Sequence, residues 1–135
     1  MPATGRCLLD TDVLVLHFRG NVQVAAHLEE YQRHHAEFDL SVISYYELER
    51  GAEMNPRKYQ LWRRFVSLCH VIELDQTIAD TAAQIYKTLA PRGDLIADAD
   101  LLIAATALTH GLTLVTHNAQ HFSRVQGLQI EDWTR

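Results

Sequence analysis

Leu8-Leu9-Asp10-Thr11-Asp12-Val13-Leu14 is the stretch that decides the fold, because in it a short apolar run stops abruptly at a carboxylate. Buried strands of parallel sheets have such continuous apolar sequences. Asp10 comes directly after a predicted strand over 6–9 and is followed by a hydroxyl and a second acid. Acids at such a boundary are poorly placed for a core and well placed to hold a hard cation such as Mg²⁺, which prefers oxygen ligands.

The remainder of the chain alternates short apolar segments with amphipathic ones. We expect further strands over 40–43, 71–74, 112–116 and 128–130, and helices over 12–18, 22–35, 44–53, 56–68, 76–89 and 99–110, with a short turn or helix at 121–122. Such alternation favours a parallel sheet covered by helices on both faces. The sequence therefore predicts an α/β fold, a three-layer α/β/α domain with a mostly parallel central sheet of four to five short strands. With 135 residues, we expect a single domain over 1–135.

Composition is that of an ordinary globular protein, with 47% hydrophobic and 21% charged residues. No stretch approaches the roughly 18 to 20 unbroken apolar residues of a membrane span, and the N-terminus has no apolar run of signal-peptide length. We therefore expect a cytoplasmic protein without a membrane partner. Cys7 and Cys69 lie in apolar surroundings, which favours free thiols over a disulfide or a metal pair.

The formal net charge of −5 argues against broad, non-specific binding of nucleic acid, which relies on a basic surface. The charge does not exclude an enzyme that acts on nucleic acid. Acids that hold a divalent metal contribute much of the negative formal charge, yet the ion attracts phosphate locally.

Polar residues follow three of the predicted strands. Asp10 follows the first, Glu47 comes shortly after the second, and Thr116 and Asn118 follow the fourth. In open parallel sheets ligands bind beyond the carboxyl ends of the strands, so these side chains are expected at one crevice. Asp98 and Asp100 instead lie at the start of a predicted helix, from which their side chains could face the same crevice.

Helix capping is the competing explanation for most of these residues. Asp12 suits the cap of the first helix. Ser44 and Glu47 fit a capping box, and Asp98 suits an N-cap. Asn118 suits a turn.

Two acids resist the capping explanation. Asp10 follows a strand directly, and Asp12 is already available as the cap. Asp100 could complement the helix dipole, but it interrupts the almost wholly apolar segment 95–108. A buried carboxylate is costly unless it is paired or bound to metal.

Four motifs, in the same order along the chain, resemble those of PIN-domain ribonucleases. They are Leu8-Leu9-Asp10-Thr11-Asp12-Val13-Leu14, Ser44-Tyr45-Tyr46-Glu47-Leu48-Glu49-Arg50-Gly51, Asp100-Leu101-Leu102-Ile103-Ala104-Ala105-Thr106-Ala107 and Leu114-Val115-Thr116-His117-Asn118-Ala119-Gln120-His121-Phe122. Length and motif set are most similar to the VapC toxins of toxin–antitoxin pairs. The resemblance implies a PIN-like fold and a metal-dependent endoribonuclease that cleaves RNA phosphodiester bonds.

The resemblance also assigns roles to residues. It implies Mg²⁺ or Mn²⁺ held chiefly by Asp10 and Asp100, with Glu47 completing the catalytic acidic pocket. Thr11, Asp98, Thr116 and Asn118 would orient ligands or substrate, with Asp98 as a further candidate ligand. Asp12 stands where the family usually has Asn, and Asn118 where many members have a fourth Asp. The second departure leaves open whether one or two ions bind, because a neutral amide is the weaker ligand.

The resemblance further implies an RNA substrate, a small cognate antitoxin and a homodimer, with the region 22–62 as a docking surface for the antitoxin. Two other interpretations remain. One is an inactive PIN-like scaffold that only binds a partner. The other is a haloacid-dehalogenase-type phosphatase, whose Asp-x-Asp start Asp10 and Asp12 resemble; a convincing downstream Lys motif is missing.

Overall fold

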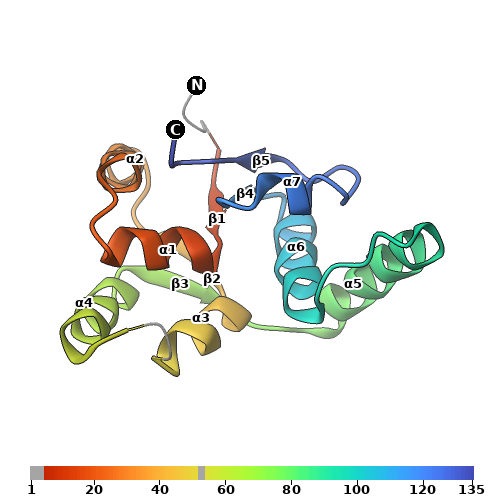
Figure 1. Cartoon of the computed structure of the whole chain (residues 1–135), viewed down its shortest axis with the longest axis horizontal. Helices are drawn as coiled ribbons and strands as arrows, with labels where there is room; N and C mark the ends of the chain where they lie inside the picture. Colours follow the sequence, from red (N-terminus) through yellow and green to blue (C-terminus); the bar gives the residue numbers. More distant parts are fainter. Residues whose placement is uncertain (1–4, 52–53) are drawn as a thin grey trace.

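A computed structural model describes residues 5–51 and 54–135, and in this part of the chain five parallel strands form one sheet (Figure 1). The strands are β1 (Cys7–Leu9), β2 (Phe38–Ser41), β3 (Cys69–Ile72), β4 (Thr113–Val115) and β5 (Ile130–Glu131). Their order across the sheet is β3-β2-β1-β4-β5. The predicted α/β fold is therefore confirmed, and the described sheet is wholly parallel.

Helices cover both faces of this sheet. They are α1 (Thr11–Phe18), α2 (Val22–Gln32), α3 (Val42–Glu49), α4 (Pro56–Val66), α5 (Gln76–Leu89), the 3₁₀ helix η1 (Ala90–Arg92), α6 (Asp98–His110) and α7 (Ala119–Phe122). Figure 1 shows α1, α2 and α4 on one side of the sheet and α5 and α6 on the other. This is the predicted three-layer arrangement.

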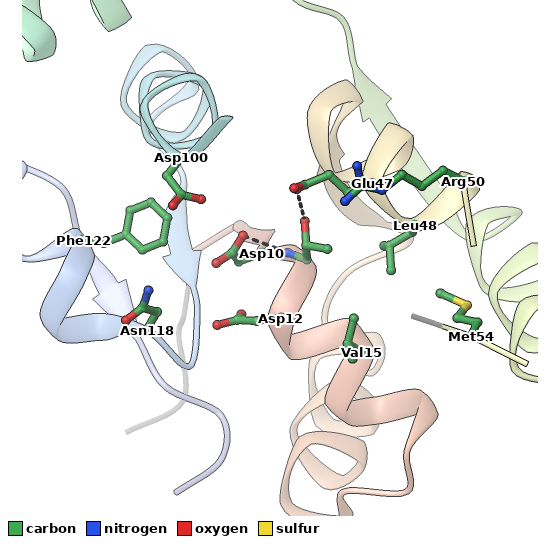
Figure 2. Close-up of a pocket in the computed structure, with 11 residues that line it drawn as sticks. Asp10, Asp12, Val15, Glu47, Leu48, Arg50, Met54, Asp100, Asn118 and Phe122 are labelled. Atoms are coloured by element: carbon green, nitrogen blue, oxygen red, sulfur yellow. Dashed lines mark hydrogen bonds between the residues drawn. The ribbon is translucent and has the colours of Figure 1, made fainter. Parts of the chain in front are cut away.

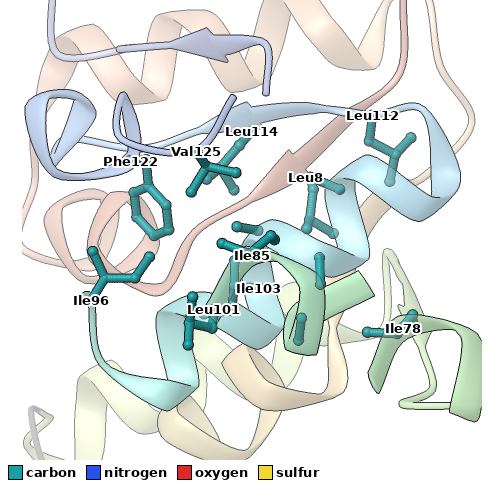
Figure 3. Close-up of a cluster of buried hydrophobic side chains, with 14 of the residues drawn as sticks. Leu8, Ile78, Ile85, Ile96, Leu101, Ile103, Leu112, Leu114, Phe122 and Val125 are labelled. Atoms are coloured by element: carbon teal, nitrogen blue, oxygen red, sulfur yellow. The ribbon is translucent and has the colours of Figure 1, made fainter. Parts of the chain in front are cut away.

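Strand alternation divides the interior into two cores. Successive side chains of a strand point to opposite faces. Leu8 accordingly packs with α5 and α6 residues such as Ile85 and Ile103 (Figure 3), whereas Leu9 packs on the α1, α2 and α4 side with Leu14 and Trp62. Both cores contain fully buried side chains, so β1 is enclosed on both faces.

Strand boundaries differ from the prediction by one or two residues, and the difference at the end of β2 affects the site. The second strand, predicted over 40–43, runs from Phe38 to Ser41, because the Ser41 hydroxyl accepts a hydrogen bond from Ser44 N and begins α3 at Val42. The third strand ends at Ile72, two residues before the predicted end. The predicted end of the helix over 44–53 lies outside the described residues; α3 itself ends at Glu49.

The chain reverses its direction of travel across the sheet at β1. From β1 it passes first to β2 on one side, and later returns through α6 to β4 on the other. Asp10 N donates to Val115 O at 2.9 Å, which ties the carboxyl ends of β1 and β4 together. Such a switch point leaves a crevice beyond the strand ends, where ligands of parallel sheets bind.

Asp39 is a buried acid on β2, outside this crevice. It is 1% exposed, accepts two hydrogen bonds from the Arg6 guanidinium at 2.6 and 3.0 Å, and lies 3.0 Å from His70 Nδ1. Its neighbours in the sheet register are Leu8 and His70. This acid therefore stabilises strand pairing, since a buried carboxylate needs partners.

The thiols match the prediction: Cys7 and Cys69 are free. Burial raises the pKa of each to about 12, which keeps them protonated and unreactive. Among the described residues, no helix has both the length and the apolar character needed to cross a membrane.

Candidate functional site

A pocket of about 250 Å³ lies at the switch point, beyond the carboxyl ends of β1 and β4 (Figure 2). Its wall is rich in oxygen atoms and holds four carboxylates. The lining residues are Asp10, Thr11, Asp12, Val15, Glu47, Leu48, Arg50, Met54, Asp100, Asn118 and Phe122. Segments that are far apart in the sequence thus contribute acids to one cavity, as expected from the strand-end rule.

Asp10 is the most deeply buried of these acids, at 5% exposure. It is the N-cap of α1, where its carboxylate accepts a hydrogen bond from Thr11 N at 2.8 Å. The Thr116 hydroxyl lies 2.8 Å from the other oxygen. Burial, followed by the negative charge of Asp12, raises the pKa of Asp10 well above its ordinary value. A nearby positive ion would favour the charged form of an acid that is buried in this way.

Asp12 is not the cap of the first helix, contrary to the prediction. Asp10 takes that position, because α1 begins one residue after β1 ends, and Asp12 falls in the first turn. The Asp12 carboxylate accepts from His117 N at 3.2 Å and lies 3.3 Å from the Thr116 hydroxyl. Burial raises the pKa of Asp12. The single hydroxyl hydrogen of Thr116 is better placed for Asp10, at the shorter distance.

Glu47 reaches the pocket from α3. The Thr11 hydroxyl lies 2.7 Å from its Oε1 and 3.0 Å from Ser44 Oγ. The predicted capping box is therefore wrong: Ser41 caps α3, Ser44 is buried in its first turn, and Glu47 turns away from the helix start toward Thr11. This contact joins the first turn of α1 to α3 (Figure 2).

Asp100 lies in the first turn of α6 and faces the same pocket from the opposite wall (Figure 2). Its Oδ2 is 3.0 Å from His121 Nε2 on α7. Sequence reasoning missed His121 as a partner of this acid. The available signal was its place just after Thr116 and Asn118, in the segment that leaves β4 at the crevice.

Asn118 and Asp98 lie at different sites in the structure. Asn118 precedes α7, makes no side-chain cap hydrogen bond and lines the acidic pocket, while its N–H donates to the Thr116 hydroxyl at 3.0 Å. Asp98 is helical rather than the predicted N-cap, because Ala97 takes that position. It lines a different groove, with Tyr86 and Leu102. Asp98 is therefore not brought to the pocket.

The donor set fits a hard divalent cation. The four carboxylates and the Asn118 amide offer oxygen ligands, and the described lining contains no thiol or imidazole. As placed, no three His, Cys, Asp or Glu side chains among the described residues enclose an ion. Instead, hydrogen bonds from Thr11 and Thr116 hold Glu47 and Asp10 at the wall. A partly open set suits Mg²⁺, which keeps several waters and uses few carboxylates.

Comparison with known proteins gives consistent matches. The family model for the PIN domain matches residues 7–128. A tRNA(fMet)-specific endonuclease VapC of Shigella flexneri is 32% identical over 94% of this chain and 97% of its own length. A ribonuclease VapC1 of Methanocaldococcus jannaschii is 34% identical over 94% and 88%. The solved structure of DNA-bound VapBC from Salmonella typhimurium is 29% identical, with a TM-score of 0.83 over 95% of this chain and 98% of that chain.

Proposed function

Since this chain belongs to the PIN-domain family and is a VapC-like member of it, we propose that it is a metal-dependent endoribonuclease, the toxin of a toxin–antitoxin pair. The observation that carries the proposal is the meeting of Asp10, Glu47 and Asp100 in one pocket. These acids come from three separate segments, at the sheet edge where ligands bind. Capping places Asp10 at the start of α1, but it accounts for neither Glu47 nor Asp100, because Ser41 and Ala97 take the N-cap positions of their helices.

In this proposal Asp10 and Asp100 hold Mg²⁺ or Mn²⁺, and Glu47 completes the acidic wall. When bound, the ion supplies Lewis-acid activation of water and neutralises charge that develops on the phosphate. Thr116 orients Asp10, and Thr11 orients Glu47, through the hydroxyl contacts described above. The Asn118 amide offers a neutral oxygen for a ligand or a water. By family resemblance the products carry 5′-phosphate and 3′-hydroxyl ends.

The test is RNA cleavage by the purified protein. We expect cleavage with Mg²⁺ or Mn²⁺, none with EDTA, and none by the Asp100→Ala variant. Initiator tRNA is the first substrate to use, because the Shigella relative is named for tRNA(fMet). Equal cleavage under all three conditions would overturn the proposal, because it would indicate a contaminating nuclease or a different site.

The two alternative interpretations make different predictions. An inactive scaffold would bind no Mn²⁺ in a calorimetric titration, whereas a nuclease binds it and loses this binding with Asp100→Ala. The phosphatase interpretation is disfavoured by membership in the PIN-domain family.

A cognate antitoxin is the expected partner, since the Salmonella neighbour was solved as VapBC. Its docking surface on residues 22–62, the homodimer and the cytoplasmic location stay predictions. Growth arrest on expression, relieved by a small neighbouring gene product and abolished by Asp100→Ala, would support the toxin assignment. Light scattering of the purified chain tests the dimer.

A further inference from the structure

An aromatic ring and a cation stand together at the mouth of the acidic pocket. Tyr46 and Arg50 are four residues apart, Tyr46 on α3 and Arg50 at its C-cap, so they share one face of the helix. The Arg50 guanidinium carbon lies 5.5 Å from the centre of the Tyr46 ring. Arg50 also lines the pocket beside Glu47 (Figure 2). Arg50 thus shares the pocket with the carboxylates, and the Tyr46 ring lies against Arg50 just outside the lining residues.

Neither side chain has a structural task that the described residues reveal. Tyr46 is 60% exposed, an unusual cost for so large a ring. Its neighbour Tyr45 instead packs on Trp62, with ring centres 5.9 Å apart. Arg50 is exposed, and within residues 5–51 and 54–135 it forms no ion pair, although it shares a pocket with four carboxylates.

This chemistry matches a nucleotide. Bases of single-stranded nucleic acid stack on exposed aromatic rings and on guanidinium planes. A guanidinium that lies over a ring still has free N–H groups at its edge, and these suit phosphate oxygens. The pocket itself is acidic and repels RNA, so a cation at its mouth offsets that repulsion where a strand must enter.

We propose that Tyr46 and Arg50 form a nucleotide-binding subsite for single-stranded RNA beside the acidic pocket. A base stacks against the pair, and the edge of the Arg50 guanidinium contacts the phosphate next to the cleaved bond. The subsite rests on the proposed ribonuclease function and adds to it a determinant of substrate binding. Tyr46 and Arg50 touch the substrate but hold no metal.

The experiment measures RNA binding separately from cleavage. Asp100→Asn serves as a non-cleaving background, and the probe is a short, unstructured, fluorescein-labelled RNA of mixed sequence, followed by anisotropy. Tyr46→Ala, Tyr46→Phe, Arg50→Ala and Arg50→Lys are introduced into this background. Tyr86→Ala and Arg92→Ala are matched controls, because both residues are exposed and lie outside the acidic pocket.

We expect Tyr46→Ala to weaken RNA binding roughly 5- to 100-fold, the loss of one stacked base, and Tyr46→Phe to stay within about twofold. Arg50→Ala should weaken binding and reduce the slope of log affinity against log salt by about 0.7, the loss of one phosphate contact. Arg50→Lys should keep that slope but bind more weakly, since it cannot stack. The controls should match the parent.

Two further measurements separate the subsite from the nuclease assignment. In the cleaving protein, Tyr46→Ala and Arg50→Ala should raise KM. Tyr46→Ala should leave the calorimetric Mn²⁺ affinity unchanged, and Arg50→Ala should not weaken it, because this variant removes a positive charge from the acidic pocket. If both variants bind RNA like the controls while the unsubstituted protein cleaves RNA, the subsite is overturned and a protein partner becomes the occupant of this surface. If the unsubstituted protein neither binds Mn²⁺ nor cleaves, the proposed function fails instead.

Discussion

Asp10 shows how a single residue can serve the fold and the site at once. As the N-cap of α1 its carboxylate is oriented by Thr11 N, and the hydroxyl of Thr116 fixes its other oxygen. The same burial that fixes it raises its pKa, with Asp12 adding like charge. In the metal-free protein this acid therefore opposes folding whenever it is ionised.

Asp10→Asn should stabilise the metal-free protein by about 0.5–2 kcal/mol at neutral pH, because asparagine also caps helices and carries no charge. The sign of the pH dependence follows from the raised pKa. The folded form binds more protons than the unfolded form between the ordinary Asp value and the raised one, so stability falls as pH rises through that window.

Urea unfolding in EDTA across this pH range measures the effect. The fall should be smaller in Asp10→Asn, and not absent, because Asp12 also has a raised pKa. A variant that is less stable than the parent at neutral pH would contradict this account of Asp10.

Asn118→Asp restores the acid that many family members have at this position. It adds a charged ligand to a pocket that already orients Asn118 inward, so Mn²⁺ affinity should rise about tenfold, since ligand charge tunes affinity for hard cations. Calorimetry gives both affinity and stoichiometry. Asp98→Asn is the matched comparison, because Asp98 lines another groove and should leave Mn²⁺ binding unchanged.

The sequence predicted correctly which side chains lie at the crevice where those residues directly follow a strand. It did not do so where the position of a side chain depends on a hydrogen-bond partner far along the chain. Asp10, Asn118 and Thr116 could be placed at the crevice from strand ends alone. Asp98 could not be excluded, since a shift of one residue at the start of α6 sends its side chain to a different groove. His121 was missed because its partner, Asp100, is 21 residues away.

At the scale of elements, the position of α3 decides whether Glu47 reaches the pocket. Glu49, on the same helix, accepts hydrogen bonds from Tyr59, Trp62 and Arg63 of α4. The buried Trp62 completes this contact. The network joins α3 to α4 and so holds Glu47 indirectly against Thr11.

Glu49→Gln should destabilise the protein by about 0.5–1.5 kcal/mol, because charge-assisted hydrogen bonds become neutral ones in a partly exposed network. The hydrogen bond from Tyr59, followed by Arg63, lowers the pKa of Glu49. The contribution of Glu49 is therefore present above the ordinary Glu value and is lost as pH falls through the lowered one.

Denaturant unfolding of both proteins as a function of pH checks this prediction. The difference between parent and Glu49→Gln should vanish at acid pH. Glu29→Gln is the control, since Glu29 lies on the exposed face of α2, 3.8 Å from Arg33. A pH-independent difference would assign the loss to packing instead.

Element prediction was sound for type and order and weaker for boundaries. Helical periodicity placed α5 over 76–89, because its apolar stripe is regular. The boundary between β2 and α3 was misplaced by two residues, since Ser41 and Ser44 are both good caps and only packing selects the first. The short apolar strands have no residue pattern, comparable to the stripe of α5, that indicates where they end.

At the scale of the whole molecule, the pocket lies between two cores. One core contains α5 and α6, of which α6 carries Asp100, and the other contains α1 and α4. The sheet joins them through β1 and β4. An ion held by Asp10 and Asp100 would therefore connect the two sides of the sheet at its open end.

Mg²⁺ or Mn²⁺ should accordingly raise the stability of the whole molecule. A ligand that binds only the folded form contributes about 2.7 kcal/mol at a hundred times its Kd. Differential scanning fluorimetry with increasing Mn²⁺ should give a rising Tm for the parent and little change for Asp10→Asn or Asp100→Asn. An equal shift in all three would locate the ion elsewhere.

Asp10 is both the N-cap of α1 and a proposed metal ligand, and this combination affects how such a protein would lose its activity under selection. Asparagine and serine cap helices nearly as well as aspartate, whereas alanine does not. Asp10→Asn or Asp10→Ser would therefore remove a proposed metal ligand and keep the cap of α1. Chains inactivated in this way would persist in the cell as folded decoys, able to sequester a cognate antitoxin from active copies.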